Sequence, residues 1–313
     1  MTSLKIYSGE TPDREKWGAL AEKSLISSPD FVSIWQSDKI RPIFFTLEED
    51  GRTLAGMAGV QSGGRLMPRF ESMIDGLAGG VHAIDDNPEI KLGLLKRALD
   101  YFRENRYFRA TIHNQESNLD MPGFKISTHT THILNISDPA INRDPKIDEH
   151  IRTGERRGAQ IVAFDNPDWL DSFQKLILQT ADRHGTVPRY EPIVFERLFE
   201  LSKKEKRIIW IAALYENRLI GSRISFVLSD RIINWQSFSD KEHGNLKANY
   251  LMMDYIIKRA SELGIKKIDL GGSPREADGL IDFKRRWGGQ ETDMTSYTYY
   301  SALGALYFRW KNR

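Results

Sequence analysis

The sequence contains no cysteine, and it lacks other features that mark particular classes of protein. Without cysteine there is no disulfide, no thiolate nucleophile and no cysteine-ligated metal, so any chemistry must use His, Asp, Glu, Ser, Thr, Lys or Tyr. No apolar run reaches the length that spans a membrane, and the N-terminal residues MTSLKIYSGETPDREKW lack the apolar core of a signal peptide. We therefore expect no transmembrane helix, no secretion and a cytoplasmic location.

The chain also lacks an excess of charge of either sign. Its 45 Lys and Arg residues nearly balance its 43 Asp and Glu residues, which leaves a formal charge of +2. This charge is too small to predict nucleic acid as a partner of the whole surface. With 313 residues, of which 40% are hydrophobic, the chain can bury a full core, and its length favours two domains over one.

Several catalytic motifs are missing as well. The sequence has no HExxH, GxSxG or GxxxxGK, so metalloprotease, serine hydrolase and nucleotide triphosphatase functions have no support. His129 and His132 have a spacing that can suit a metal, but they fall in an expected strand, where residues three apart face opposite sides. No carboxylate or third histidine accompanies them. We therefore predict no metal site.

Two distant segments share one pattern, which indicates an internal repeat. Residues Ile43 to Val60 and Ile209 to Val227 each contain an apolar strand, a polar turn and a second strand, as in a β-hairpin. A long helix and a further strand are expected after each hairpin: Ile90 to Asn105 with Tyr107 to Ile112, and Ala248 to Leu263 with Ile265 to Leu270. The pattern predicts an α/β protein with two similar domains, 1–138 and 139–300, each with a mixed, largely antiparallel sheet flanked by helices.

The segment from Leu251 to Gly289 is the most informative part of the chain. Its apolar spacing predicts an amphipathic helix that Gly264 ends, then a strand that ends at Gly271 and Gly272. In the short helix that follows, Lys284 borders an apolar arc. An ammonium group there can turn inward toward an anion or extend into solvent. The spacing alone leaves both alternatives open.

A hairpin, a long helix, a strand and a short helix, in that order, resemble the acetyltransferase superfamily known as GNAT. A standard acetyl-CoA-binding member has Arg/Gln-x-x-Gly-x-Gly/Ala at the start of the long helix, where backbone N–H groups hold the pyrophosphate. The matching stretch here is Lys241-Glu242-His243-Gly244-Asn245-Leu246. It keeps one glycine and ends in leucine, which counts against acyl-CoA as the donor.

The chain further resembles the Fem-type non-ribosomal peptidyltransferases, which are tandem-GNAT proteins that transfer an amino acid from aminoacyl-tRNA to the peptide stem of a cell-wall precursor. The resemblance spans nearly the whole chain and is sharpest at three motifs. These are Asp182-Arg183-His184-Gly185 followed by Arg189, Asp269-Leu270-Gly271-Gly272, and Phe283-Lys284. The resemblance implies the armless kind of Fem protein, in which the C-terminal residues 301–313 pack back on the first domain.

The resemblance also implies where substrates bind. The lysine of the Phe-Lys pair and the arginine after Arg-His-Gly are expected at the active site, where they hold anionic groups. The chain departs from the family at two tyrosines, because Ile193 stands where one is expected and Trp235 or Ser237 replaces the other. The expected residues are Lys284 as the catalytic residue and, for substrate binding, Arg189, Tyr190, Trp235, Ser237, Phe283, Lys39, Gly271 and Gly272.

The function implied is N-acyl transfer from aminoacyl-tRNA to an amine of a nucleotide- or lipid-linked cell-envelope peptide precursor. No cofactor is expected beyond these co-substrates, and peripheral contact with a membrane stays open. Two alternatives remain: a GNAT N-acyltransferase that uses acyl-CoA or an acyl carrier, and a binding protein that keeps the fold without catalysis.

Overall fold

The computed structural model describes residues 2–74, 77, 79–114, 122–137, 143–274 and 277–311. The chain divides into two compact units, which consist of Met1–His129 with Asp293–Arg313 and of Thr130–Thr292. These divisions fall inside strands β7 (Lys125–Asn135) and β13 (Gln290–Tyr300). The predicted boundary at 138 lies outside the described residues.

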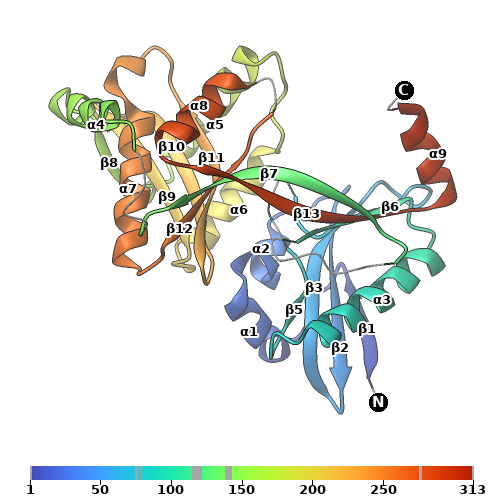
Figure 1. Ribbon diagram of the computed structural model, residues 1–313. Helices are drawn as coiled ribbons and strands as arrows, with labels where there is room; N and C mark the ends of the chain where they lie inside the picture. Colours follow the sequence, from blue (N-terminus) through green and yellow to red (C-terminus); the bar gives the residue numbers. More distant parts are fainter. Residues whose placement is uncertain are drawn as a thin grey trace. The chain divides into compact units, whose positions relative to one another are not determined.

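Unit 1 is built on a mixed sheet (Figure 1). Its strands have the order β1-β2-β3-β4-β6-β13, and the pairing is antiparallel except between β4 and β6. The strands are β1 (Ser3–Ser8), β2 (Arg41–Glu49), β3 (Arg52–Ser62), β4 (Arg69–Glu71), β5 (His82–Ala83), which pairs with β3, and β6 (Arg109–Asn114). The helices are α1 (Arg14–Lys23), η1 (Leu25–Ser27), α2 (Pro29–Ser33), α3 (Pro88–Glu104) and α9 (Ala302–Lys311).

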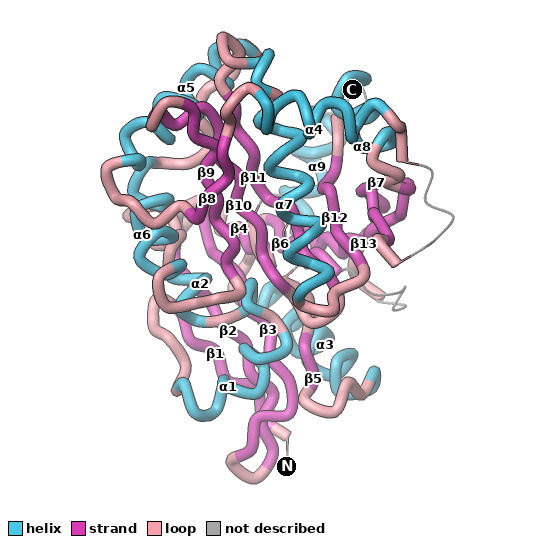
Figure 2. The backbone as a smooth tube through the Cα atoms, turned by 90° about the vertical axis from the view of Figure 1, so that its left-hand side faces the viewer, coloured by secondary structure: helices cyan, strands magenta, loops and turns pink. Residues whose placement is uncertain are grey.

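Unit 2 repeats this strand order when its strands are read from the opposite end. The order is β7-β12-β11-β10-β9-β8, and only β11 and β12 are parallel. The strands are β8 (Gln160–Ala163), β9 (Ile208–Tyr215), β10 (Arg218–Val227), β11 (Arg231–Ser239) and β12 (Lys267–Gly272). The helices are α4 (Lys146–Arg156), α5 (Trp169–Arg183), α6 (Pro192–Ser202), η2 (Gly244–Leu246), α7 (Ala248–Glu262) and α8 (Asp278–Arg286). Figure 2 shows α7 on one side of β9–β11 and α5 and α6 on the other.

The predicted repeat is confirmed element by element. Strands β2 and β3 form one hairpin and β9 and β10 the other, and each hairpin turns through two residues with positive φ. These are Asp50 and Gly51 in unit 1, and Glu216 and Asn217 in unit 2, a backbone geometry that suits tight hairpins. In both units a long helix then leads to a strand that pairs in parallel fashion, α3 to β6 and α7 to β12. The predicted α/β class with tandem, largely antiparallel sheets is therefore confirmed.

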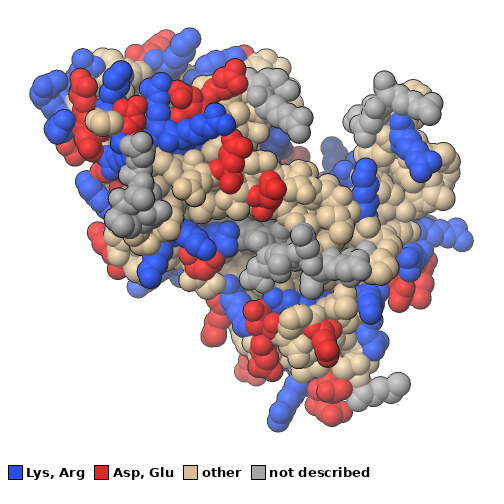
Figure 3. Space-filling model, in the orientation of Figure 1, with Lys and Arg blue, Asp and Glu red and all other residues tan. Residues whose placement is uncertain are grey.

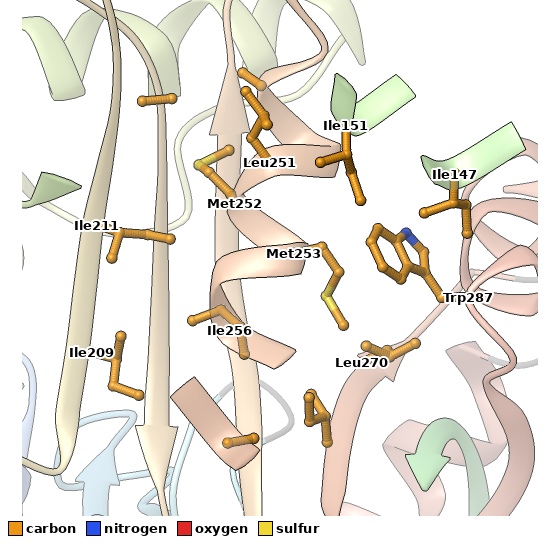
Figure 4. Close-up of a cluster of buried hydrophobic side chains, with 14 of the residues drawn as sticks. Ile147, Ile151, Ile209, Ile211, Leu251, Met252, Met253, Ile256, Leu270 and Trp287 are labelled. Carbon is orange, nitrogen blue, oxygen red and sulfur yellow. The ribbon is translucent and has the colours of Figure 1, made fainter. Parts of the chain in front are cut away.

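Helix α7 forms because its apolar residues recur at three- and four-residue intervals. Met252, Met253, Ile256 and Ala260 are fully buried against the sheet, and burial of a side chain the size of methionine or isoleucine stabilises by about 1.5–3 kcal/mol. Figure 4 shows Met253 projecting from α7 toward the side chains of other elements in this core. Gly264, with φ of 70°, ends the helix as predicted, and the N–H of Ile265 returns to the carbonyl of Ala260.

The C-terminal helix α9 belongs to unit 1. The ring of Phe308 packs against Phe108 at 6.2 Å between centroids and against Tyr300 at 4.9 Å. The opposite side of α9 is exposed and apolar, with Leu303, Leu306 and Trp310 at helical spacing. Among the residues that the structure describes, no helix has the length and apolar character needed to cross a membrane.

Candidate functional site

The Lys284 side chain is buried, at 4% exposure, in the last turn of α8. Its ammonium group donates to the carbonyl oxygens of Gly271 at 2.6 Å and Gly272 at 2.8 Å, and to Ser273 Oγ at 2.9 Å. An ammonium group has three N–H donors, so all of them are in use. Of the two alternatives left by the sequence, the inward orientation is the one observed, and the anion is replaced by backbone dipoles.

The turn that Lys284 holds is fixed from its other side by Asp269. Gly271 has φ of 78°, a left-handed conformation that glycine adopts without the strain other residues incur. Its N–H donates to Asp269 Oδ1 at 2.8 Å, and the same oxygen accepts from the Thr131 hydroxyl of β7. Asp269 and Thr131 are both buried, so the carboxylate is committed to this turn. Lys284 and Asp269 therefore hold the Gly271–Gly272 turn from two sides by hydrogen bonds.

Burial shapes the charge of this site. Removal from water disfavours the ammonium form and lowers the pKa of Lys284 to about 8, although the charge of Asp269 opposes this effect. No ion pair joins Lys284 to a carboxylate in the described part of the chain. Near neutral pH the side chain is thus a buried positive charge that hydrogen bonds to neutral groups only.

His132 is another buried titratable group of unit 2, which the sequence analysis considered only as a metal ligand. It lies on β7 and is 3% exposed, whereas His129 is exposed, as expected for residues three apart on a strand. Neither ring nitrogen has a hydrogen-bond partner among the described residues, and Nε2 is 3.8 Å from Glu291 Oε1. Burial and, after it, the nearby charge of Lys284 lower the pKa of His132, so the ring is neutral at pH 7.

The structure brings two other candidates together, Tyr190 and Trp235. Their ring centroids are 5.5 Å apart, and Trp235 also contacts Phe195 of α6 and Phe226 of β10. Trp235 occupies the extra position of a β-bulge, because Ser225 pairs with Asn234 and Ile224 with Gln236. The bulge therefore positions an aromatic side chain of β11 beside the segment that precedes α6.

The remaining candidates lie elsewhere. The ring of Phe283 packs against Tyr250 of α7 at 5.4 Å and against Trp287 at 6.3 Å between centroids. Phe283 therefore supports the packing of α8. Arg189 is exposed in the loop between α5 and α6. Ser237 is exposed on β11, where its hydroxyl donates to Asn249 Oδ1 at 3.3 Å. Lys39 is exposed in unit 1, in the loop before β2.

The start of α7 lacks the form of a phosphate cradle. The N–H groups of Gly244, Leu246 and Lys247 already donate to backbone carbonyls within the turn η2. Leu246 is buried, and Gly154 of α4 lies so close that an added Cβ would be 2.7 Å from the Leu246 carbonyl oxygen. These three amides cannot bind a pyrophosphate without rearrangement of the turn. This geometry agrees with the missing glycine of the motif.

Sequence reasoning missed one further residue, Arg223 of β10. It is 5% exposed, and its only described hydrogen bond joins Nη1 to the sulfur of Met253 at 3.6 Å. The available signal was a charged residue in the middle of the otherwise apolar strand LIGSRISFV.

No three His, Asp or Glu side chains of the described residues are grouped as metal ligands. The site therefore offers buried positive charge, fixed backbone dipoles and aromatic surface. Such a site can bind anionic groups and stabilise negative charge that develops in a reaction.

Comparisons with known proteins support the fold. Residues 144–294 match the family model described as Acetyltransferase (GNAT) domain. The crystal structure of FemX superposes with a TM-score of 0.74 at 12% identity, and the match covers 96% of this chain and 99% of that one. L-PGS from Bacillus licheniformis gives 0.61 at 13% identity with 95% of each chain covered. A search of curated proteins finds no match.

A third solved structure is described as a tandem GNAT protein from the clavulanic acid biosynthesis pathway. It superposes with a TM-score of 0.54 at 13% identity, and the match covers 95% of this chain and 98% of that one. Identities this low establish the fold alone. The chain thus has the tandem GNAT fold that the sequence predicted, and the resemblance to Fem-type proteins is confirmed at the level of the fold.

Proposed function

We propose that this tandem GNAT chain is an N-acyltransferase of the Fem type, with its active site in unit 2. In this proposal the donor is aminoacyl-tRNA and the acceptor is an amine of a cell-envelope peptide precursor or a related compound. The observation that carries it is the buried ammonium of Lys284, held on the carbonyls of Gly271 and Gly272 without a carboxylate partner among the described residues. A buried charge without a direct ion pair is costly, and its presence points to a functional role.

The positive charge of Lys284 has a role in the aminolysis of an ester. The lone pair of a neutral acceptor amine attacks the ester carbonyl carbon, and negative charge develops on the carbonyl oxygen. The carbon–oxygen bond to the terminal ribose then breaks, an amide forms, and the ribose oxygen takes up the proton that the amine loses. Positive charge fixed near the carbonyl oxygen lowers the barrier, and removal of one such group typically reduces kcat by about 10²–10³.

Lys284 can act in this way only if one of its acceptors gives up its place. The Ser273 hydroxyl is the acceptor most easily replaced, because it can rotate away, whereas the two carbonyls belong to a turn that Asp269 also holds. We assign the developing oxyanion to the position of Ser273 Oγ. Tyr190 and Trp235 would offer aromatic surface to the substrate, and exposed Arg189 would contact a phosphate.

The donor assignment depends on the start of α7. An acyl-CoA donor needs free backbone N–H groups for its pyrophosphate, and those of Gly244, Leu246 and Lys247 are already bonded. An aminoacyl ester on tRNA makes no such demand, because its phosphates extend over a long polymer and can be held by exposed cations such as Arg189.

A single-turnover experiment tests the proposal. Purified protein is mixed with a labelled aminoacyl-tRNA pool or with labelled acetyl-CoA, together with a mixture of peptide amines, and loss of the acyl group is followed. We expect acyl loss from aminoacyl-tRNA, and Lys284→Met should slow it strongly. Transfer from acetyl-CoA alone would replace the donor assignment. No turnover with either donor, or turnover that Lys284→Met leaves unchanged, would favour the binding-protein alternative.

One observation favours a lipid-linked acceptor over a free one. The exposed side of α9 presents Leu303, Leu306 and Trp310, and positions 301–313 contain two Arg and one Lys but no Asp or Glu. The visible surface of α9 in Figure 3 is accordingly tan and blue. An apolar stripe with basic flanks suits the interface of an anionic membrane.

Sedimentation with vesicles tests this second candidate. The protein should pellet with vesicles that contain phosphatidylglycerol and stay in solution with phosphatidylcholine alone. Leu306→Glu combined with Trp310→Glu should abolish pelleting. Leu178→Glu, at an exposed position of α5, should not. Equal pelleting of both variants would remove the argument for a lipid-linked acceptor and leave the acyltransferase proposal intact.

A further inference from the structure

Arg223 is a buried and poorly partnered charge among the described residues of unit 2. The side chain extends from the middle of β10 and is 5% exposed, and burial lowers its pKa to about 10. Its Nε has no acceptor among the described residues, and Nη1 has only the thioether sulfur of Met253, at 3.6 Å. Sulfur in a thioether is a weak acceptor, so it compensates little of the lost hydration.

The comparison with Lys284 shows how unusual this is. Lys284 is equally buried, but three oxygen atoms accept from its three N–H donors. The guanidinium of Arg223 has five N–H donors and a single acceptor among the described residues. Buried charges in folded proteins are paired or fully hydrogen bonded, so an isolated one indicates a missing partner.

A second N–H donor beside Arg223 is directed at the position that an anionic partner of Arg223 would fill. Asn234 of β11 directs its amide Nδ2 to the same sulfur atom at 3.3 Å, while its Oδ1 accepts from the Ser225 hydroxyl at 2.7 Å. Two N–H groups of neighbouring strands thus converge on one weak acceptor, Met253 Sδ. Methionine is flexible and readily repacks, so an oxygen anion can take the place of its sulfur atom.

The end of the β11–β12 pairing leaves an edge of β11 from which a ligand would approach this position. Parallel pairing of β11 with β12 covers only Arg231 to Ile233, so the later residues of β11 have no partner strand on that side. Ser237, which is paired directly with Arg223 across β10 and β11, is exposed. Its hydroxyl and the side chain of Asn249 line the entrance, where they hydrogen bond to each other at 3.3 Å.

We propose that Arg223, with Asn234, forms an internal anion-binding position of unit 2, entered past Ser237 and Asn249, which takes a carboxylate or phosphate group of a substrate. A guanidinium group suits both, because its N–H donors form two parallel hydrogen bonds with a pair of oxygen atoms. The position is distinct from that of Lys284, which lies on α8 and is saturated by the β12 turn. It therefore adds a second anchor to the proposed acyltransferase but does not depend on that activity.

Binding measurements on the full chain test the proposal without any acyl transfer. Melting temperature and isothermal titration are measured with inorganic phosphate, with N-acetylglycine and with chloride at matched ionic strength, for the native protein and for Arg223→Met. We expect phosphate or N-acetylglycine, but not chloride, to stabilise the native protein. Arg223→Met should weaken that binding by about tenfold or more. The stronger of the two ligands identifies the chemical group.

The melting temperature of Arg223→Met without ligand separates a role in binding from a role in folding. If Arg223 is retained for a ligand, removal of its buried charge should raise the melting temperature of the ligand-free protein while it abolishes stabilisation by anions. Arg231→Met is the matched control, since Arg231 sits on the next strand and pairs with Asp230 at 2.7 Å. Anion binding that persists in Arg223→Met but disappears in Lys284→Met would overturn the proposal, as would a native protein that no anion stabilises.

Discussion

Lys284 donates a hydrogen bond to the carbonyl oxygen of Gly271 at 2.6 Å, which ties the end of α8 to the end of β12. The N–H of the same glycine donates to Asp269 at 2.8 Å. Both backbone polar groups of Gly271 are therefore occupied, one by a cation and one by an anion. The turn cannot move without breaking one of these bonds, so the charge of Lys284 is held in a fixed position.

Substitution at Ser273 and Lys284 should have opposite consequences. Ser273→Ala removes one of three acceptors and leaves an N–H of the ammonium group free, so we expect it to retain or increase the rate of acyl transfer. Lys284→Met should reduce kcat by about 10²–10³. Lys258→Met is the control, because Lys258 is exposed and pairs with Asp254 at 2.7 Å. If Ser273→Ala lost as much activity as Lys284→Met, the oxyanion would not occupy the hydroxyl position.

The rate should depend on the protonation of Lys284. Because burial lowers its pKa to about 8, kcat/KM should fall as the pH rises through that value. Lys284→Arg keeps its positive charge at all these pH values. Its kcat/KM should therefore not fall as the pH rises, even if its overall rate is lower. A pH–rate profile of both proteins with one acceptor checks this. Identical profiles would show that the titrating group is elsewhere, for instance on the acceptor amine.

The same pKa has a consequence for stability. Between about pH 8 and the ordinary lysine value of 10.5, the unfolded chain holds a proton that the folded chain has released. The free energy of unfolding should therefore rise with pH across this window relative to that of Lys284→Met. Urea denaturation at pH 7.5 and 9.5 measures the difference.

Alanine substitutions at two glycines should shift stability in opposite directions. Gly271 has positive φ, and a left-handed conformation costs other residues about 1–2 kcal/mol, so Gly271→Ala should destabilise by about that amount. Gly279 lies in α8 with open space around it, and alanine in a helix is favoured over glycine by about 0.5–1 kcal/mol. Gly279→Ala should thus be neutral or stabilising. Denaturation curves of both variants check the pair, and equal losses would contradict the backbone argument.

His132 should make the protein sensitive to acid. Its lowered pKa means that the folded chain binds a proton less readily than the unfolded chain, so the free energy of unfolding should fall as the pH drops below 6.5. His132→Leu should remove this dependence and leave stability at pH 7.5 unchanged or higher, since the buried ring nitrogens have no described partners. Exposed His129, on the same strand, provides the control His129→Leu, which should keep the acid sensitivity.

Much of the fold could be predicted because its signals are local. The hairpins show their turns in Glu49-Asp50-Gly51 and Glu216-Asn217, and α7 shows its apolar spacing and its terminating Gly264. The division between domains was harder to place. The sequence shows polar segments, whereas the units divide inside β7 and β13, and the contacts of these strands depend on residues distant in sequence.

The candidate site was predicted only in part. Lys284, Gly271 and Gly272 were named from their motifs, but that they hydrogen bond to one another required the packing of α8 against β12. His132 was considered only as a metal ligand, and Arg223 was read as part of a strand. Both became notable when the structure showed that they are buried and poorly partnered, a property that depends on residues distant in sequence.

The amino-acid sequence by itself determined the repeat, the elements and the presence of a lysine beside a glycine turn, because periodicity, turn residues and helix ends act over a few neighbouring positions. The tertiary structure alone decided which charges are removed from water. Burial depends on which strands and helices pack around a residue, and that is why the ammonium of Lys284 is satisfied by carbonyls while the guanidinium of Arg223 is left with the sulfur of Met253.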